Sequence, residues 1–161
     1  MPLPMAVLTA ILLAAAPAPP PDAFDPRLTP LGGGPEIALS EDSGGPAIVL
    51  FWRSDCAPCL IELAHLAALD EAARPGRLIT VALEPAAAAA AKLEDLGLAA
   101  GRAYAVAGGE ADAEAVLAAA SEGGRRLPYA IALDGAGGIC ARHLGLLGTE
   151  RARDWTRRCS T

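Results

Sequence analysis

The sequence predicts an α/β fold in which helices flank a central mixed β-sheet that closes with an antiparallel C-terminal hairpin. Two continuous apolar runs, Ala47–Trp52 and residues 78–83, have the composition of strands that are buried on both faces. A helix-like segment separates the two runs, so together they form a β–α–β unit. Near the C-terminus, Tyr129–Leu133 and Ile139–Leu144 flank the turn sequence DGAGG, which is the pattern of a β-hairpin.

The first half of the chain predicts a short strand and a long helix. We expect the strand at residues 36–39 and a turn at the SEDSGG that follows it. Ser54 or Asp55 can cap a helix over residues 56–73, because either side chain can accept a hydrogen bond from the first helical N–H groups.

The second half predicts two further helices before the hairpin and one after it. The helix at residues 85–96 is opened by its proline and continues through a run of alanines, which are strong helix formers. A weaker strand at residues 104–107 is followed by a helix at residues 111–121. A final helix at residues 149–159 closes the chain.

The chain is organised as one domain behind an N-terminal targeting segment. Its 161 residues are enough for one domain with its own core, expected at residues 24–161. Residues 1–23 are expected to be a signal peptide or N-terminal anchor with a proline-rich linker. The apolar run at residues 5–16 is short for a membrane span and suits a signal peptide. The prolines of residues 17–21 and the irregular DPRLTPLGGGP after them predict an extended, mobile segment.

The net charge limits the classes of partner. A formal charge of −6 argues against nucleic acid or an anionic membrane surface as the main partner. The charge says little more than this, because a net negative charge is usual for a soluble protein.

The stretch FWRSDCAPCLIELAHL places Cys56 and Cys59 at the first turn of a helix, directly after a buried strand. Free N–H groups at a helix start stabilise a thiolate, and the spacing lets the second sulfur reach the first. These features favour a redox pair.

Two alternatives stay open at this point, half of a metal site or a purely structural disulfide. A zinc site normally needs four ligands at close spacing. Cys140 and Cys159 lie far apart in the sequence, and His65 and His143 form no paired motif, so we expect no metal. A purely structural disulfide would leave an exposed, electropositive position without a use.

The surroundings of the two cysteines resemble the active site of thioredoxin-fold oxidoreductases, with FW, three residues and then CAPC opening a helix. Within that superfamily the chain most resembles the exported TlpA-like thiol–disulfide reductases, which include cytochrome c maturation proteins, over about residues 36–155. The resemblance implies a thioredoxin-like fold in which Cys56 attacks a client disulfide and Cys59 resolves the mixed disulfide.

The resemblance also implies partners and a location. No bound cofactor is expected, because the dithiol itself carries the electrons. The clients would be disulfide-bearing exported proteins of a bacterial periplasm, and a membrane thiol reductase would supply electrons. We expect a monomer, with its N-terminal segment either removed or kept as an anchor.

Two further positions match the family, and each has a simpler reading. Glu62 stands where these reductases carry a carboxylate beneath the dithiol; burial there would raise its pKa and let it exchange a proton with the resolving thiol. Its alternative is a solvated surface glutamate. Pro128 stands at the position of the cis-proline of the fold, and its alternative is a proline that simply begins a strand.

Three positions depart from the family pattern. Leu127 stands where Thr or Val is commoner and where the family contacts the substrate disulfide. Asp55 replaces an uncharged residue before Cys56, and a carboxylate there should disfavour the thiolate, which favours a reducing protein. Ala64 replaces a proline that usually kinks the helix, so a straighter helix is expected.

The other two cysteines raise a separate question. In an exported protein, Cys140 and Cys159 are expected to pair as a structural disulfide that ties the C-terminus to the sheet. The alternative is a free buried cysteine at 140 and an exposed one at 159.

Two rival functions use or ignore the same dithiol. A copper metallochaperone could hold Cu(I) between Cys56 and Cys59, because thiolates suit that ion. A redox-inert interaction module would leave both cysteines unreactive.

Overall fold

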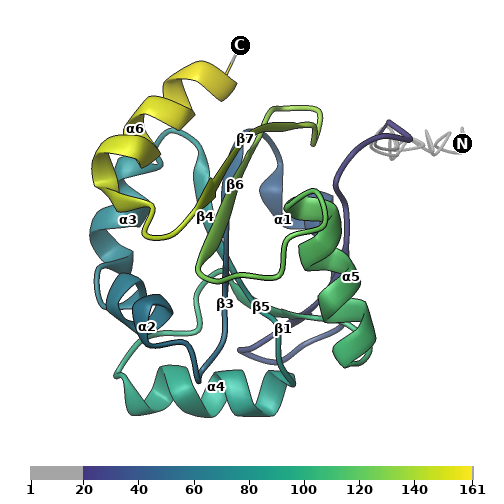
Figure 1. Ribbon diagram of the computed structural model, residues 1–161, viewed down its shortest axis with the longest axis vertical. Coiled ribbons are helices and arrows are strands. Elements are labelled where there is room, and N and C mark those ends of the chain that lie inside the picture. The colour runs from purple at the N-terminus through teal and green to yellow at the C-terminus, as the bar shows by residue number, and fades with distance from the viewer. Residues whose placement is uncertain (1–19, 161) are drawn as a thin grey trace, which may run out of the picture.

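A seven-stranded mixed sheet runs through the centre of the molecule in the computed structural model, which describes residues 20–160 (Figure 1). The strands are β1 Arg27–Pro30, β2 Ile37–Ala38, β3 Ala47–Trp52, β4 Arg77–Ala82, β5 Ala103–Val106, β6 Tyr129–Leu133 and β7 Ile139–Leu144. The helices are α1 Leu39–Ser43, α2 Ala57–Leu63, α3 Leu66–Ala72, α4 Ala86–Asp95, α5 Glu110–Ala120 and α6 Gly148–Cys159. The strand order is β2-β1-β5-β4-β3-β6-β7.

The predicted architecture is confirmed. Strand β3 is parallel to β4 and antiparallel to β6, and β6 forms the expected hairpin with β7. Helices α2, α3 and α6 lie on one side of the sheet, and α1 and α5 lie on the other (Figure 1). The result is an α/β sandwich around a mixed sheet.

Strand β3 occupies the middle of the sheet and is buried along its whole length. Its residues alternate between two cores: Ile48, Leu50 and Trp52 face the helices α2, α3 and α6, whereas Val49 and Phe51 face α1 and α5. Strand side chains point to opposite faces in turn, so a continuous apolar run is what a strand covered on both sides requires.

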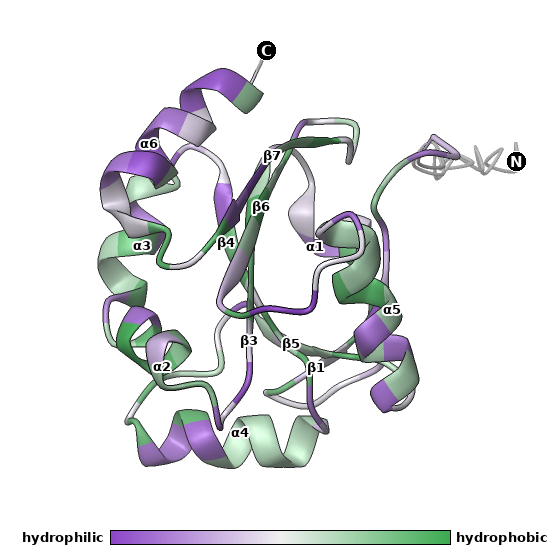
Figure 2. Ribbon diagram, in the orientation of Figure 1, coloured by the Kyte–Doolittle hydropathy of each residue, from purple (hydrophilic) through white to green (hydrophobic). Residues whose placement is uncertain are grey.

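Helix α6 packs closely on its face of the sheet. Most of this helix is hydrophilic (Figure 2), yet Ala152, Trp155 and Cys159 are buried on its inner side. The sheet beneath it presents small side chains from β6, Ala130 and Ala132. Small residues on the sheet and an apolar stripe on the helix let the two elements approach.

Strand β1 was not expected, because its segment resembles a loop in sequence. Arg27–Pro30 lies inside the stretch predicted to be mobile, but it pairs antiparallel with β5, Leu28 opposite Val106. Leu28 is fully buried. The pairing partner is almost eighty positions away in the printed sequence, so no local pattern could indicate it.

Helix α1 replaces the predicted turn, and the predicted strand before it shortens to β2. The N–H and Oγ of Ser40 both donate to the carboxylate of Asp25, at 2.7 and 2.9 Å. The N–H of Ala38 donates to Glu41 at 2.7 Å. Acceptors that satisfy the free N–H groups of a first turn favour a helix, and the decisive one comes from outside the segment.

The expected long helix is two helices, so the expectation of a straighter helix at Ala64 was wrong. The chain leaves α2 through a tight turn in which His65 donates its N–H to the carbonyl oxygen of Glu62 at 2.9 Å. Helix α3 then starts at Leu66 and packs against α6. The helix therefore breaks here without a proline, at the turn between Glu62 and His65.

The predicted targeting segment falls mainly on residues 1–19, which lie outside the described residues. Within residues 20–160, no helix has the length and apolar character of a membrane span.

Candidate active site

Cys56 and Cys59 form a disulfide at the start of α2, with their Cα atoms 5.2 Å apart. Cys59 is fully buried, whereas Cys56 is only partly buried. The sulfur of Cys56 accepts the N–H of Cys59 at 3.3 Å and so caps the helix itself. The expectation that Ser54 or Asp55 would cap this helix was wrong, because the side chains of both are held elsewhere.

The loop before Cys56 is fastened to the end of β4. Ser54 donates its N–H and its hydroxyl to the carboxylate of Glu84, at 2.7 and 2.6 Å. Arg53 donates to the carbonyl oxygen of Leu83 at 3.0 Å and pairs with Asp55 at 3.1 Å. Sequence reasoning missed Glu84; its place directly after a buried parallel strand was the available signal.

Glu62 is a buried carboxylate, only 4% exposed, and not a solvated surface group. Its Oε1 accepts two backbone N–H groups, from Leu147 at 2.5 Å and Gly148 at 3.3 Å. Burial raises the pKa of Glu62, against the opposing effects of these two donors and of the charges of Arg151 and His65. Within the described residues, Oε2 is buried and has no hydrogen-bond partner.

Glu62 follows Cys59 by three residues in α2, so the two side chains leave the helix on nearly the same side. A buried carboxyl with a raised pKa and a free oxygen can take a proton from a neighbouring thiol and return it.

Pro128 lies at the same end of the sheet as the dithiol. The Leu127–Pro128 peptide bond is cis, and the next residue, Tyr129, pairs with Phe51 near the end of β3. Four residues after β3 the chain reaches Cys56. Leu127 is partly buried and packs against both cores, which places it at the sheet end between them.

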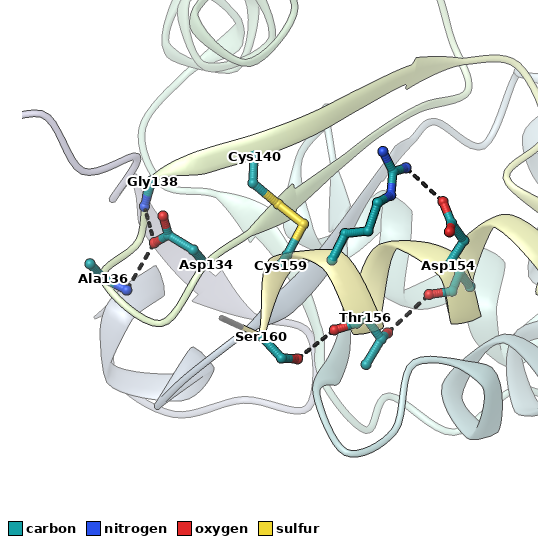
Figure 3. Close-up of a disulfide and its surroundings, with 10 residues drawn as sticks. Asp134, Ala136, Gly138, Cys140, Asp154, Thr156, Cys159 and Ser160 are labelled. Atoms are coloured by element: carbon teal, nitrogen blue, oxygen red, sulfur yellow. Dashed lines mark hydrogen bonds and ion pairs between the residues drawn. A yellow bond between two sulfur atoms is a disulfide. The ribbon is translucent and has the colours of Figure 1, made fainter.

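Cys140 and Cys159 form a second disulfide on another part of the molecule, with Cα atoms 6.1 Å apart. Figure 3 shows Cys140 on β7 reaching Cys159 at the end of α6. Neither residue is near the start of α2 in the chain or in the pairing of the sheet.

The described residues gather no group of three or more His, Cys, Asp or Glu side chains that could hold a metal ion. The disulfide itself offers thiol–disulfide exchange at the partly exposed Cys56, with the buried Cys59 and a buried carboxyl behind it.

No family model matches the chain, and neither does any curated protein. Among solved structures, a thioredoxin-family thiol:disulfide interchange protein from Chlorobium tepidum TLS superposes with a TM-score of 0.65 at 15% identity, covering 90% of this chain and 99% of that one. The chain has the thioredoxin fold.

Two further structures show the same thioredoxin fold. StoA from Bacillus subtilis has a TM-score of 0.60 at 21% identity and covers 81% of this chain and 94% of its own. Copper-bound ScoI from Bradyrhizobium japonicum has a TM-score of 0.60 at 14% identity, with coverages of 86% and 99%. At these identities the similarity is one of fold, so the predicted thioredoxin-like fold is confirmed and the TlpA-like subfamily stays a prediction.

Proposed function

We propose that this protein is a thiol–disulfide oxidoreductase that reduces disulfides of exported client proteins through Cys56 and Cys59. The observation that carries the proposal is the order and burial of three side chains at and after the start of α2. The partly exposed Cys56 stands at the helix start, the fully buried Cys59 follows it, and the buried Glu62 comes one turn later.

The reaction starts from the dithiol form. The Cys56 thiolate attacks one sulfur of the client disulfide, and the other client sulfur leaves as a thiolate. The N–H of Cys59, which lies 3.3 Å from the Cys56 sulfur in the disulfide, is a donor that stabilises negative charge there. The attack falls to Cys56 because Cys59 is inaccessible.

Resolution follows inside the helix. Cys59 loses its proton and attacks the Cys56 sulfur, which forms the Cys56–Cys59 disulfide and releases the second client thiolate. Two electrons pass from the protein to the client, and two client thiols result once protons are taken up. Glu62 is the group that receives the Cys59 proton, because its Oε2 is buried and free of other partners within the described residues.

The client has to reach Cys56 across the surface that surrounds it. Pro128 and Leu127 are proposed to contact the client backbone, as in the family that the sequence resembles. Two large apolar side chains close to Glu62 are exposed. Ile61 precedes Glu62 in α2 and is 56% exposed, and Leu146, which precedes the Leu147 that donates to Glu62, is 47% exposed. Exposed apolar side chains close to the helix that follows the dithiol suit an unfolded or loosely folded polypeptide.

We also propose an exported, periplasmic protein of the TlpA-like type that receives electrons from a membrane thiol reductase. The apolar run at residues 5–16 and the presence of a second disulfide, between Cys140 and Cys159, support an oxidising compartment. Cell fractionation of the full chain tests the location; recovery of the protein from the cytoplasm alone would contradict it.

The decisive experiment is single-turnover reduction of insulin by the pre-reduced protein with no other reductant present. One disulfide should be reduced per chain by the unmodified protein, and none by Cys56→Ala. The Glu94→Gln variant, which changes an exposed glutamate on α4, is the matched control and should react normally. No reduction by the unmodified dithiol form would overturn the proposal.

The copper alternative relies on the same two sulfurs and finds no third ligand among the described residues. A Cu(I) ion held by two thiolates requires both of them, so copper binding that persists in Cys56→Ala would point to another site. No step of the proposed reaction involves copper.

A further inference from the structure

The second disulfide closes a covalent loop from β7 through α6. Cys140 is an extra residue in the pairing of β7 with β6: Ala141 lies opposite Ala132 and Ile139 opposite Leu133, with Cys140 unpaired between them. Such a bulge turns a side chain away from the regular alternation. Here it brings Cys140 to the side of the sheet that α6 covers, where Cys159 completes the bond (Figure 3).

The tip of this loop touches the candidate active site at two points. Gly145 donates its N–H to the carbonyl oxygen of Pro128 at 2.9 Å. Leu147 and Gly148, where α6 begins, donate their N–H groups to Oε1 of Glu62. The closed loop therefore contacts both the cis-proline and the buried carboxylate, although its disulfide lies at the other end of α6.

The rest of α6 packs against α3 and the sheet. Thr156 donates its hydroxyl to the carbonyl oxygen of Ala73 at 3.1 Å, and Trp155 is buried against the sheet. Cys159, the last residue of the helix, is 5% exposed and is bonded to the edge strand. Loss of the disulfide would leave the helix attached mainly by packing on one side.

We infer that the Cys140–Cys159 disulfide is a positioning element for the redox reaction: it holds the start of α6 against Glu62 and Pro128. The inference rests on the proposed function of Cys56 and Cys59. It goes further, because it makes proton transfer at Glu62 depend on a bond outside the active site.

The electrostatic consequence follows from what surrounds Glu62. The groups that face it are the N–H donors of Leu147 and Gly148, Arg151 on α6 and His65 at the N-cap of α3, besides the neighbouring dithiol. Arg151 and both donors belong to the loop that the disulfide closes. Loss of these three partners removes effects that lower the pKa of Glu62, whereas any loss of burial acts in the opposite direction. Movement of the loop therefore changes this pKa.

The two disulfides differ in how easily a thiolate could leave them. Cys56 lies before the N-terminus of a helix, and Cys59 donates an N–H to its sulfur. Cys159 lies at the C-terminus of α6, where the helix dipole disfavours a negative charge. The positioning disulfide is therefore expected to persist while Cys56 and Cys59 cycle.

The test uses the full chain carrying Cys140→Ser together with Cys159→Ala. Alanine is chosen at 159 because a serine there would bury an unpaired hydroxyl. The first readout is amide hydrogen exchange of Leu147 and Gly148 in the oxidised protein. We expect exchange to be faster by about tenfold or more relative to the amides of β3.

The second readout is the pH profile of single-turnover disulfide reduction, which should shift in the double variant. In a Glu62→Gln background, removal of the Cys140–Cys159 bond should cause no further movement, because the titrating group is gone. Leu117→Ala, in α5 on the opposite face of the sheet, is the control for a general loss of stability and should leave the profile in place.

A double variant that is only less stable, with amide exchange and pH profile unchanged, overturns the inference. If the double variant does not fold, the same two measurements are made on the Cys140→Ser variant alone. Failure of the unmodified protein to reduce any disulfide would contradict the proposed function, whereas the exchange of Leu147 and Gly148 would still decide whether the disulfide positions the loop.

Discussion

The backbone N–H of Leu147 lies 2.5 Å from Oε1 of Glu62, a contact between residues 85 positions apart in the chain. It joins the start of the last helix to the helix that carries the dithiol. The carboxylate keeps a hydrogen bond in a buried place, and its second oxygen, Oε2, is left without a partner among residues 20–160. Glu62 is thus both anchored and able to accept a proton.

The first prediction concerns stability and pH. Burial raises the pKa of Glu62 in the folded protein above its usual value of 4.5. At pH values between the pKa of the unfolded chain and that of the folded protein, the folded protein binds more protons than the unfolded chain. The stabilisation that Glu62 contributes is fully present at pH values below its pKa in the unfolded chain. It is lost as the pH rises through its pKa in the folded protein. The Glu62→Gln variant stays neutral, so it should gain stability relative to the unmodified protein as pH rises.

The measurement is the difference in midpoint temperature between the two oxidised proteins over a series of pH values. Glu94→Gln, at an exposed position on α4, is the control and should show no such trend. A difference between Glu62→Gln and the unmodified protein that stays constant with pH would contradict the role of burial.

The second prediction separates the attacking cysteine from the resolving one. When the reduced protein reacts with dithionitrobenzoate, the unmodified chain should release two thionitrobenzoate anions and retain none. Cys59→Ala should release one and keep one bound to Cys56, because no second thiol can displace it. Mass spectrometry of the intact chain, with Cys140 and Cys159 still bonded, counts the adduct; an adduct-free Cys59→Ala would exclude Cys56 as the reactive thiol.

The third prediction concerns the loop before the dithiol. Glu84→Ala removes two hydrogen bonds from Ser54, at a partly buried position, and should lower the free energy of unfolding by about 1–2 kcal/mol. The reaction of Cys56 with dithionitrobenzoate should also slow, because the loop that presents it is loosened. Denaturant unfolding and stopped-flow kinetics measure the two effects.

Glu84→Gln sharpens this test, since its amide can still accept one hydrogen bond from Ser54 without the negative charge. It should recover about half of the lost stability. Glu94→Ala, on the exposed side of α4, should change neither quantity. If Glu84→Ala and Glu94→Ala had the same unfolding free energy and the same reaction rate, the hydrogen bonds between Ser54 and Glu84 would have no effect on either quantity.

The sequence was most informative where structure is determined locally. The run Ala47–Trp52 alternates between two cores and was predicted to be a central strand to the residue. The hairpin of β6 and β7 also matches its predicted bounds, because its turn is encoded by glycines and an aspartate whose side chain accepts the N–H groups of Ala136 and Gly138.

The sequence failed where a distant group decides. Helix α1 depends on Asp25, fifteen residues from the Ser40 that it caps, and β1 depends on pairing with β5. In the candidate site, the cysteine spacing is visible in the sequence. The hydrogen bonds of Ser54 to Glu84 and of Leu147 to Glu62 could not be predicted from it. Both arise only when separate elements meet at one end of the sheet.

The last prediction concerns Asp55, the unusual residue before Cys56. Its carboxylate should disfavour the Cys56 thiolate, but it is 72% exposed and pairs with Arg53 at 3.1 Å, so solvent and the guanidinium weaken the effect. Asp55→Asn should therefore raise the alkylation rate of Cys56 by iodoacetamide at neutral pH only about twofold. Asp95→Asn, at an exposed position on α4, is the control and should leave the rate unchanged. A slower reaction in Asp55→Asn would mean that the Arg53–Asp55 pair acts by holding the loop rather than by charge.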